Sequence, residues 1–240
     1  MINEQQALLA KVIDVFAETF DKKAILRGGM VLRILGSPRF TNDLDYVFVP
    51  FRSKNEIVKE ILTCLKSIEN AEVSHTLNSK CLRVILKVNQ VIIQIEAHVA
   101  MNIDTSVATT QLFSPQFHLP KRIIHVVDHS TSMANKLAAW NERRLARDLY
   151  DIWFFVRMNI KPNLEILRKR LKKPLYSRLV KEKDYFPGGD VDAFYEFVRQ
   201  KAAELDDHEI ADQLSDYLTP DELIGLPIRI RAALATLFEM

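Results

Sequence analysis

The stretch "LRGGMVLRILGSPRFTNDLDYVF", residues 26–48, decides the fold because it joins a strand, a glycine pair, a short helix and a second strand. "KAILRGG" predicts a strand over 23–27, and "MVLRILG" predicts two helical turns that end at Gly36. A glycine pair between a strand and a helix lets the backbone approach a phosphate, and the helix N-terminus adds unpaired N–H groups. Gly28 and Gly29 are therefore candidate phosphate-binding residues, although an ordinary turn is the commoner reason for such a pair.

The second strand, "DLDYVFV", carries Asp43 and Asp45 one residue apart. Because side chains alternate between the faces of a strand, both carboxylates point to one face and Leu44 points to the core. Adjacent carboxylates repel each other unless a cation lies between them, and Mg²⁺ prefers such oxygen ligands while leaving positions for substrate phosphates. The pair is a candidate metal site. The alternative is an edge strand with a solvated acidic face.

A third carboxylate, Glu96, lies within the apolar stretch "VIIQIEAHV", where an unpaired charge is unfavourable. If this strand lies beside the strand with the aspartates, Asp43, Asp45 and Glu96 form a three-carboxylate platform for two metal ions. Such a platform is used for phosphoryl and nucleotidyl transfer. The alternative is that Glu96 is an outward charge on a half-exposed strand.

The chain divides near residue 128 into two halves of different pattern. The first half has helical patterns over 3–20 and 52–68 and strand patterns over 71–77, 81–88 and 91–99, with "VNQ" as a hairpin turn. The second half has helical patterns over 130–156, 163–173, 190–205 and 219–240. Asp190 is predicted as a helix N-cap, and Thr219 with Glu222 as a capping box. We therefore expect an α/β (α+β) domain with a mixed sheet over 1–128 and an all-helical domain over 129–240.

The composition places no strong limit on the partner. The 33 Lys and Arg residues nearly balance the 31 Asp and Glu residues, and 48% of the residues are hydrophobic, so a core can form. The two cysteines are too few for a disulfide framework, and the N-terminus lacks the apolar run of a signal peptide. No window approaches the roughly eighteen apolar residues of a membrane span. We expect a cytoplasmic protein with no membrane partner.

A second group of charged residues lies in "NKLAAWNERRLARDLYDIW". If residues 134–157 form one helix, four charged residues fall within roughly 80° of one another and make a polar stripe: Lys136, Arg143, Arg147 and Asp151. The stripe could bind phosphate groups, or it could be only the solvated face of an amphipathic helix with an Arg147–Asp151 pair. A break near Arg144 would remove the stripe.

The two groups together resemble a known family. A strand, a Gly-Gly pair that opens a helix, and then R-F-[ST]-x-D-L-D are the pattern of the nucleotidyltransferase fold in the polymerase-beta-like superfamily. In particular, the pattern looks like the nucleotidyl transferase AbiEii/AbiGii toxin family. The second family motif, a helix with Lys followed by R-D-x-x-D, matches Lys136 and residues 147–151, so the resemblance covers roughly residues 22–157. One position departs from the family, which has Ser or Thr after the glycine pair where this chain has Met30.

The resemblance implies a nucleotidyltransferase that moves a nucleoside monophosphate from an NTP to an acceptor hydroxyl and releases pyrophosphate. It implies Mg²⁺ in a two-metal site, with Mn²⁺ as an alternative, held by Asp43, Asp45 and Glu96, or with Glu96 as the base. With Lys136 these are the expected catalytic residues. The implied nucleotide-binding residues are Gly28, Gly29, Met30, Arg39, Lys136, Arg147, Asp148 and Asp151, with the two aspartates orienting the cations. The active cleft is expected between the domains.

The resemblance also implies a toxin of a toxin–antitoxin or phage-defence pair, with transfer RNA as the acceptor and an antitoxin protein as a partner. The stretch 168–183 carries eight Lys or Arg residues against one Glu and could position RNA, or it could be a solvated helix surface. Two other functions stay open. One is AMP transfer to a protein hydroxyl, and the other is a non-catalytic binding or regulatory module, which Met30 favours.

Overall fold

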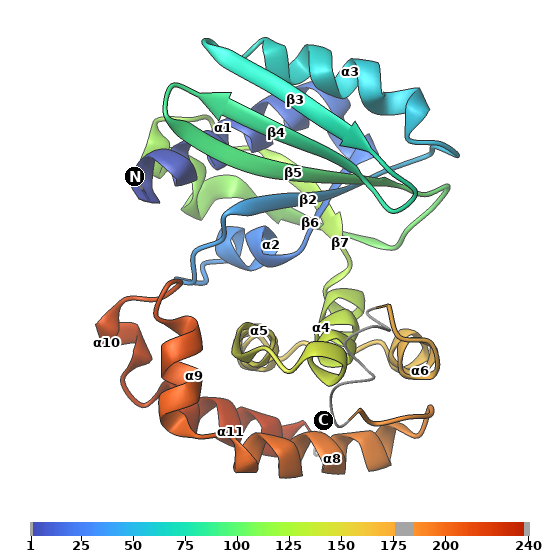
Figure 1. The fold of residues 1–240 in the computed structure, drawn as a ribbon, viewed down its shortest axis with the longest axis vertical. Helices are drawn as coiled ribbons and strands as arrows, with labels where there is room; N and C mark the ends of the chain where they lie inside the picture. Colours follow the sequence, from blue (N-terminus) through green and yellow to red (C-terminus); the bar gives the residue numbers. More distant parts are fainter. Residues whose placement is uncertain (1, 176–184, 238–240) are drawn as a thin grey trace. The chain divides into compact units, whose positions relative to one another are not determined.

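The computed structural model describes residues 2–175 and 185–237 of the 240-residue chain (Figure 1). The chain divides into two compact units, 1–128 and 129–240. The boundary lies where the last strand of the structure ends, at Val127. No helix among the described residues combines the length and the apolar character that a membrane span requires.

The first unit is built on a seven-stranded mixed sheet with the order β3-β4-β5-β2-β1-β7-β6. The strand β2 lies at its centre, antiparallel to β1 and parallel to β5. The strands are β1 (Ala24–Arg27), β2 (Asp43–Phe48), β3 (Ala71–Leu77), β4 (Leu82–Val88), β5 (Val91–Val99), β6 (Thr105–Thr109) and β7 (Ile123–Val127).

One face of this sheet is covered by helices, and its side chains form the main core of the unit (Figure 1). The helices are α1 (Ile2–Phe20), α2 (Gly29–Ile34) and α3 (Asn55–Lys66), with the 3-10 turns η1 (Asp21–Lys23), η2 (Thr110–Leu112) and η3 (Ser114–Phe117). Aromatic rings join α1 to β2: the centroids of Phe16 and Tyr46 are 5.1 Å apart, and those of Phe20 and Phe48 are 5.0 Å apart. Side chains alternate between the two faces along β2. Asp45, before Tyr46, and Val47, after it, therefore point to the opposite face of the sheet.

The strands β6 and β7 were not predicted from the sequence. The strand β6 is short and mostly exposed, with Val107 63% exposed, so it lacks the alternation that marks a half-buried strand. It is held by antiparallel pairing with β7, which in turn runs parallel to β1. By contrast, the predicted hairpin turn is confirmed, because Val88 pairs with Val91 across a two-residue connection.

The second unit contains helices and no strand among its described residues. They are α4 (His129–Arg143), α5 (Ala146–Arg157), α6 (Leu164–Lys172), α8 (Val191–Glu204), α9 (Asp207–Leu214), α10 (Pro220–Leu223) and α11 (Leu226–Thr236). Both predicted caps are confirmed: Asp190 accepts hydrogen bonds from the first turn of α8, and Thr219 and Glu222 form a capping box. The helix predicted over 219–240 is in fact interrupted after α10 at Gly225, which has a φ of +65°.

The prediction of one helix over 134–157 is wrong, because the chain turns between α4 and α5. Arg144 has a φ of +54°, outside the helical region. Its guanidinium lies over the ring of Trp140, 4.4 Å from the centroid, and donates to the Trp140 carbonyl oxygen at 2.9 Å. Leu145 is extended, and α5 starts at the next residue. The polar stripe calculated for a continuous helix therefore does not exist.

Candidate active site

The turn after β1 brings the backbone of Gly28 against the carboxylate of Asp45. Gly28 has a φ of +79°, and the preceding residue, Arg27, is the register partner of Asp45. A Cβ atom on Gly28 would lie 2.7 Å from Oδ2 of Asp45, closer than real Cβ contacts. Only glycine combines this backbone conformation with this approach. The two halves of the opening motif, the glycine pair and the aspartates, are therefore in direct contact.

The loop before β2 adds a guanidinium and a hydroxyl to the same place. A Cβ atom on Gly29 would lie 2.7 Å from Nη2 of Arg39 and 3.2 Å from Oγ1 of Thr41. Arg39 is only 5% exposed, and Oγ1 of Thr41 donates to Oδ1 of Asp43 at 2.9 Å. Thr41 was missed as a site residue, although it stands at the Ser or Thr position of the R-F-[ST]-x-D-L-D pattern.

Met30 turns away from this cluster. Its side chain is 1% exposed and belongs to the hydrophobic core that the sheet shares with α1 and α3. A hydroxyl side chain in the same orientation would also point into the core. A nucleotide-binding role of Met30 therefore falls to its backbone, which lies in the first turn of α2.

Asp43 and Asp45 share one face of β2, as the alternation predicts. Leu44 between them is fully buried in the core, whereas Asp43 is exposed and Asp45 half-buried. In the parallel register with β5, Asp43 lies beside Gln94 and Asp45 beside Glu96. The prediction that the strand of Glu96 neighbours the strand of the aspartates is therefore confirmed.

The carboxylate of Glu96 is turned toward β4. Its Oε1 accepts hydrogen bonds from Nη2 and Nε of Arg83, at 2.8 and 3.2 Å, and from Nε2 of Gln94 at 3.2 Å. Across residues 2–175 and 185–237, no group of three or more His, Cys, Asp or Glu side chains is arranged to hold a metal ion. The role of Glu96 as a third metal ligand therefore stays a prediction. Asp43 and Asp45 are the carboxylates whose placement suits a hard cation.

His98 shares the face of β5 with Glu96 and is uncharged at neutral pH. Burial lowers its pKa to about 4, and the nearby positive charge of Arg27 acts in the same direction. Its Nε2 atom is buried and has no hydrogen-bond partner among the described residues. The sheet face beside Glu96 therefore carries a neutral imidazole and not an additional positive charge.

The second motif forms a buried ion network within the helical unit. Nζ of Lys136 lies 2.5 Å from Oδ2 of Asp151 and 3.5 Å from Oδ1 of Asp148. Arg143 binds Asp148 with two hydrogen bonds, of 2.6 and 2.7 Å. Burial alone would raise the pKa of Asp148, but Lys136 and Arg143 outweigh it and hold that pKa below its ordinary value. The aspartates orient Lys136, as expected, and also Arg143, which belonged to the predicted polar stripe but was not among the expected nucleotide-binding residues.

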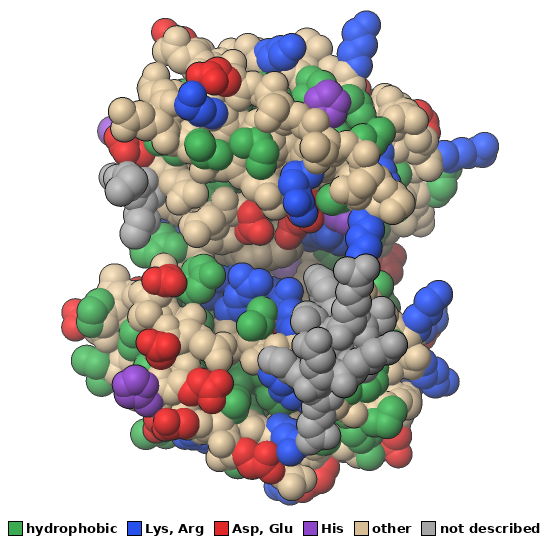
Figure 2. Space-filling view, viewed as in Figure 1, with side chains coloured by type: hydrophobic (Ala, Val, Ile, Leu, Met, Phe, Trp, Pro, Cys, Tyr) green, Lys and Arg blue, Asp and Glu red, His purple; other side chains and the backbone are tan. Residues whose placement is uncertain are grey.

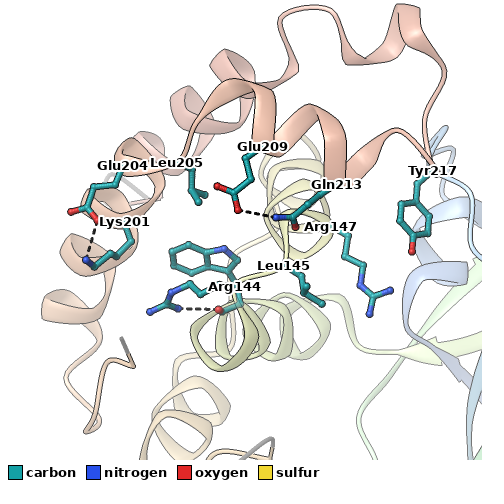
Figure 3. A pocket seen from close by; sticks show the side chains of 10 residues that line it. Arg144, Leu145, Arg147, Lys201, Glu204, Leu205, Glu209, Gln213 and Tyr217 are labelled. Atoms are coloured by element: carbon teal, nitrogen blue, oxygen red, sulfur yellow. Dashed lines mark hydrogen bonds and ion pairs between the residues drawn. The ribbon is translucent and has the colours of Figure 1, made fainter. Parts of the chain in front are cut away.

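Arg147 is not bonded to this network, although its positive charge also helps to lower the pKa of Asp148. Among the described residues its side chain makes no hydrogen bond and no ion pair, so the alternative pair with Asp151 does not form. Instead it lines a pocket of the helical unit together with residues of α4, α8 and α9 (Figure 3). The predicted site residues therefore make one cluster in the first unit and two groups in the second. The cleft between domains stays a prediction.

Comparison with known proteins agrees with the fold. The family described as "Nucleotidyl transferase AbiEii toxin, Type IV TA system" matches residues 13–235. Among solved structures, MenT4, a nucleotidyltransferase toxin from Mycobacterium tuberculosis, is 17% identical with a TM-score of 0.64, covering 100% of this chain and 84% of that one. JHP933 from Helicobacter pylori is 14% identical with a TM-score of 0.59, covering 99% and 91%. No match is found among curated protein sequences.

Proposed function

Because the chain belongs to the AbiEii family of nucleotidyltransferase toxins of type IV toxin–antitoxin systems, we propose that it transfers a nucleoside monophosphate from an NTP to RNA. Family membership makes it a nucleotidyltransferase with a nucleotide substrate and a cognate antitoxin. The proposal adds Mg²⁺ dependence and transfer RNA as the acceptor. The observation that supports it is the contact of Gly28 with Asp45, because it joins the turn that we expect to bind phosphate to the carboxylate pair that we expect to bind the metal.

Asp43 and Asp45 would hold Mg²⁺, or Mn²⁺ in its place. Proteins usually bind Mg²⁺ through one or two carboxylates together with substrate phosphates, so a pair on one strand face is sufficient. When bound, the ion would offset the negative charge that develops on the phosphate oxygens. Thr41 fixes Asp43 through its hydroxyl, and the backbone of Gly28 limits the positions that Asp45 can take. Both ligands are therefore held before the nucleotide arrives.

The residues around this pair have separate roles in the transfer. The oxygen of the acceptor hydroxyl forms a bond to the α-phosphorus, the bond from that phosphorus to the oxygen bridging the β-phosphate breaks, and pyrophosphate leaves. Glu96 accepts the hydroxyl proton, and Arg83 and Gln94 hold its carboxylate in place. Arg39, whose guanidinium lies against Gly29, contacts the phosphates.

Lys136 adds positive charge from the helical unit. Its side chain is 17% exposed, and its ammonium group is already paired with two buried carboxylates, so it contributes as a positioned charge rather than as a flexible one. The basic stretch 168–183 is a further candidate for RNA contact. Within it, residues 168–175 are described, and Tyr176 with the remaining lysines and arginine lies outside the described residues.

The test is transfer of label from each of four α-³²P-labelled NTPs, with Mg²⁺, to total RNA and to cell lysate protein. We expect label on RNA, and a loss of at least about a hundredfold in Asp43→Asn and Asp45→Asn. Asp104→Asn is the matched control, because Asp104 is an exposed aspartate of the same unit outside the cluster. Label on protein alone would replace RNA with a protein acceptor. No label above that of Asp45→Asn with any nucleotide would overturn the proposed function.

A further inference from the structure

The helical unit contains a pocket of its own, formed by α4, α5, α8 and α9, with a volume of about 610 Å³ (Figure 3). Small-molecule sites in proteins commonly range from about 300 to 1,000 Å³. The pocket is lined by aromatic side chains, leucines and three cations, set against two carboxylates. Its size and its mixed lining therefore suit an anionic ligand that also has a flat apolar part.

Arg147 places a positive charge at one end of this pocket. It is the second residue of α5, where the helix dipole adds to the charge of the guanidinium. The amide of Ala146 before it donates to Oε1 of Gln213 at 2.9 Å, which joins the start of α5 to α9. In Figure 3 the Arg147 side chain extends from α5 in the same direction as Tyr217, which follows α9. Its neighbour Asp148, by contrast, is buried in the ion network.

Trp140 forms part of the wall of the pocket. The residue is fully buried, and its Nε1 atom is closed off from solvent and has no hydrogen-bond partner among the described residues. The indole therefore contributes an apolar surface to the wall. The guanidinium of Arg144 covers the ring of Trp140 and keeps a further cation at the same wall.

The two carboxylates of the lining offset only part of the positive charge. Glu204 is paired with Lys201 at 2.9 Å, and Glu209 accepts a hydrogen bond from the neutral amide of Gln213 at 3.1 Å. Other acidic side chains lie on the exposed surface around α9, where Figure 2 shows them on the outside of the helical unit. Arg144 and Arg147 therefore stand against Glu209 alone, and the end at Arg147 is the favourable position for an anion.

We propose that this pocket binds a nucleotide, with a phosphate on Arg147 at the start of α5 and the base against the ring of Tyr217. Arginine suits phosphate because its planar fork can donate two parallel hydrogen bonds, and bases stack on aromatic rings whatever their sequence. The inference deepens the proposed function, on which it rests, by giving the helical unit nucleotide-contacting residues of its own in addition to Asp43 and Asp45 of the first unit. The nucleotide is either a free nucleotide or one within an RNA strand.

The experiment measures binding without catalysis, in full-length Asp45→Asn protein with EDTA. One arm follows the fluorescence anisotropy of a short fluorescein-labelled single-stranded RNA, and the other titrates AMP and ATP by calorimetry. We expect Arg147→Ala to weaken binding about tenfold and to lower the salt dependence by about one phosphate contact, with partial recovery in Arg147→Lys. Arg157→Ala is the control, because it removes the same charge from the exposed far end of the same helix.

The arms also identify the ligand. Loss confined to the RNA arm assigns the pocket to the acceptor strand, and loss in the AMP and ATP arm assigns it to a free nucleotide. The inference is overturned if neither ligand binds, or if Arg147→Ala and Arg157→Ala bind both ligands alike while unfolding at the same temperature. Because no transfer is measured, a failure of the proposed reaction in the labelling assay leaves this result readable on its own.

Discussion

The ammonium group of Lys136 lies 2.5 Å from Oδ2 of the fully buried Asp151, so α4 and α5 are joined by an ion pair inside the helical unit. Removing one member of such a pair leaves a buried charge without compensation, which costs about 3–5 kcal/mol. We expect Lys136→Met to lower the free energy of unfolding by about that amount, as measured by urea denaturation. The labelling assay on this variant must therefore be run where it is still folded.

The control for Lys136 is Lys169→Met. Lys169 pairs with Glu165 at 2.6 Å, but their side chains are 72% and 76% exposed. Exposed pairs contribute little to stability because solvent screens them, so this variant should unfold almost like the wild type. Equal stability of the two lysine variants would contradict a structural role for the Lys136–Asp151 pair.

The pKa of Asp148 predicts how the stability of the network depends on pH. Because that pKa is below its ordinary value in the folded chain, the ionised carboxylate stabilises the fold above about pH 4. This contribution is lost as the pH falls below 4 toward the lower pKa of the folded state. We expect Asp148→Asn to be less stable than the wild type at pH 7, with a difference that shrinks in acid.

The measurement for Asp148 is a series of urea denaturations between pH 7 and pH 2.5. Asp192→Asn is a suitable reference, since Asp192 is an exposed aspartate in the first turn of another helix. A difference between Asp148→Asn and the wild type that stays constant over the whole range would show that the carboxylate is not the source of the stability.

Substitution of Gly28 allows a test that separates the effect of backbone strain from the effect of the contact with Asp45. Gly28 and Gly188 both have positive φ, of 79° and 93°, so alanine is strained at either position. A Cβ at Gly28 would press on Oδ2 of Asp45, whereas nothing lies within 4 Å of one at Gly188. We expect both alanine variants to lose about 1 kcal/mol of stability, but only Gly28→Ala to lose nucleotidyl transfer, by at least about tenfold. Equal activity of the two variants would remove Gly28 from the site.

The sequence alone was sufficient to predict which side chains at the centre of the sheet are buried and which share the other face. The alternation in "DLDYVFV" predicted that Leu44 is buried and that the aspartates share the other face, because a strand has only two faces. The pairing of Arg83 with Glu96 could also be predicted from the sequence. A two-residue turn between Val88 and Val91 fixes the register of β4 and β5 and puts these residues opposite each other.

The break between α4 and α5 could not be predicted from the sequence in the same way. "NERRLARD" contains no glycine or proline, and its residues favour a continuous helix. The positive φ of Arg144 is supported by packing from distant residues, since its guanidinium lies over Trp140 and also 5.0 Å from the ring centroid of Phe197 in α8. Tertiary contacts therefore outweigh local propensity here, and this turn separates Arg147 from the network of Lys136.

Glu96 can be assigned as base or as metal ligand by its own variants. Its Oε1 is already bound by Arg83 and Gln94, which favours a base that is oriented from β4 over a ligand shared with Asp43 and Asp45. We expect Glu96→Gln to lower kcat by about 10²–10⁴ while the Mg²⁺ concentration for half-maximal activity stays unchanged. A rise in that Mg²⁺ concentration would instead make Glu96 a metal ligand.

Arg83 supplies the companion test, because it acts through Glu96 rather than on the substrate. We expect Arg83→Met to lower kcat less than Glu96→Gln does and to leave KM for the NTP unchanged, since the carboxylate loses only the donors that orient it. Lys87→Met is the control on the same strand, where Lys87 pairs with the exposed Glu72 at 2.9 Å. If Arg83→Met and Lys87→Met have the same kcat as the wild type, the ion pair with Glu96 has no part in the transfer.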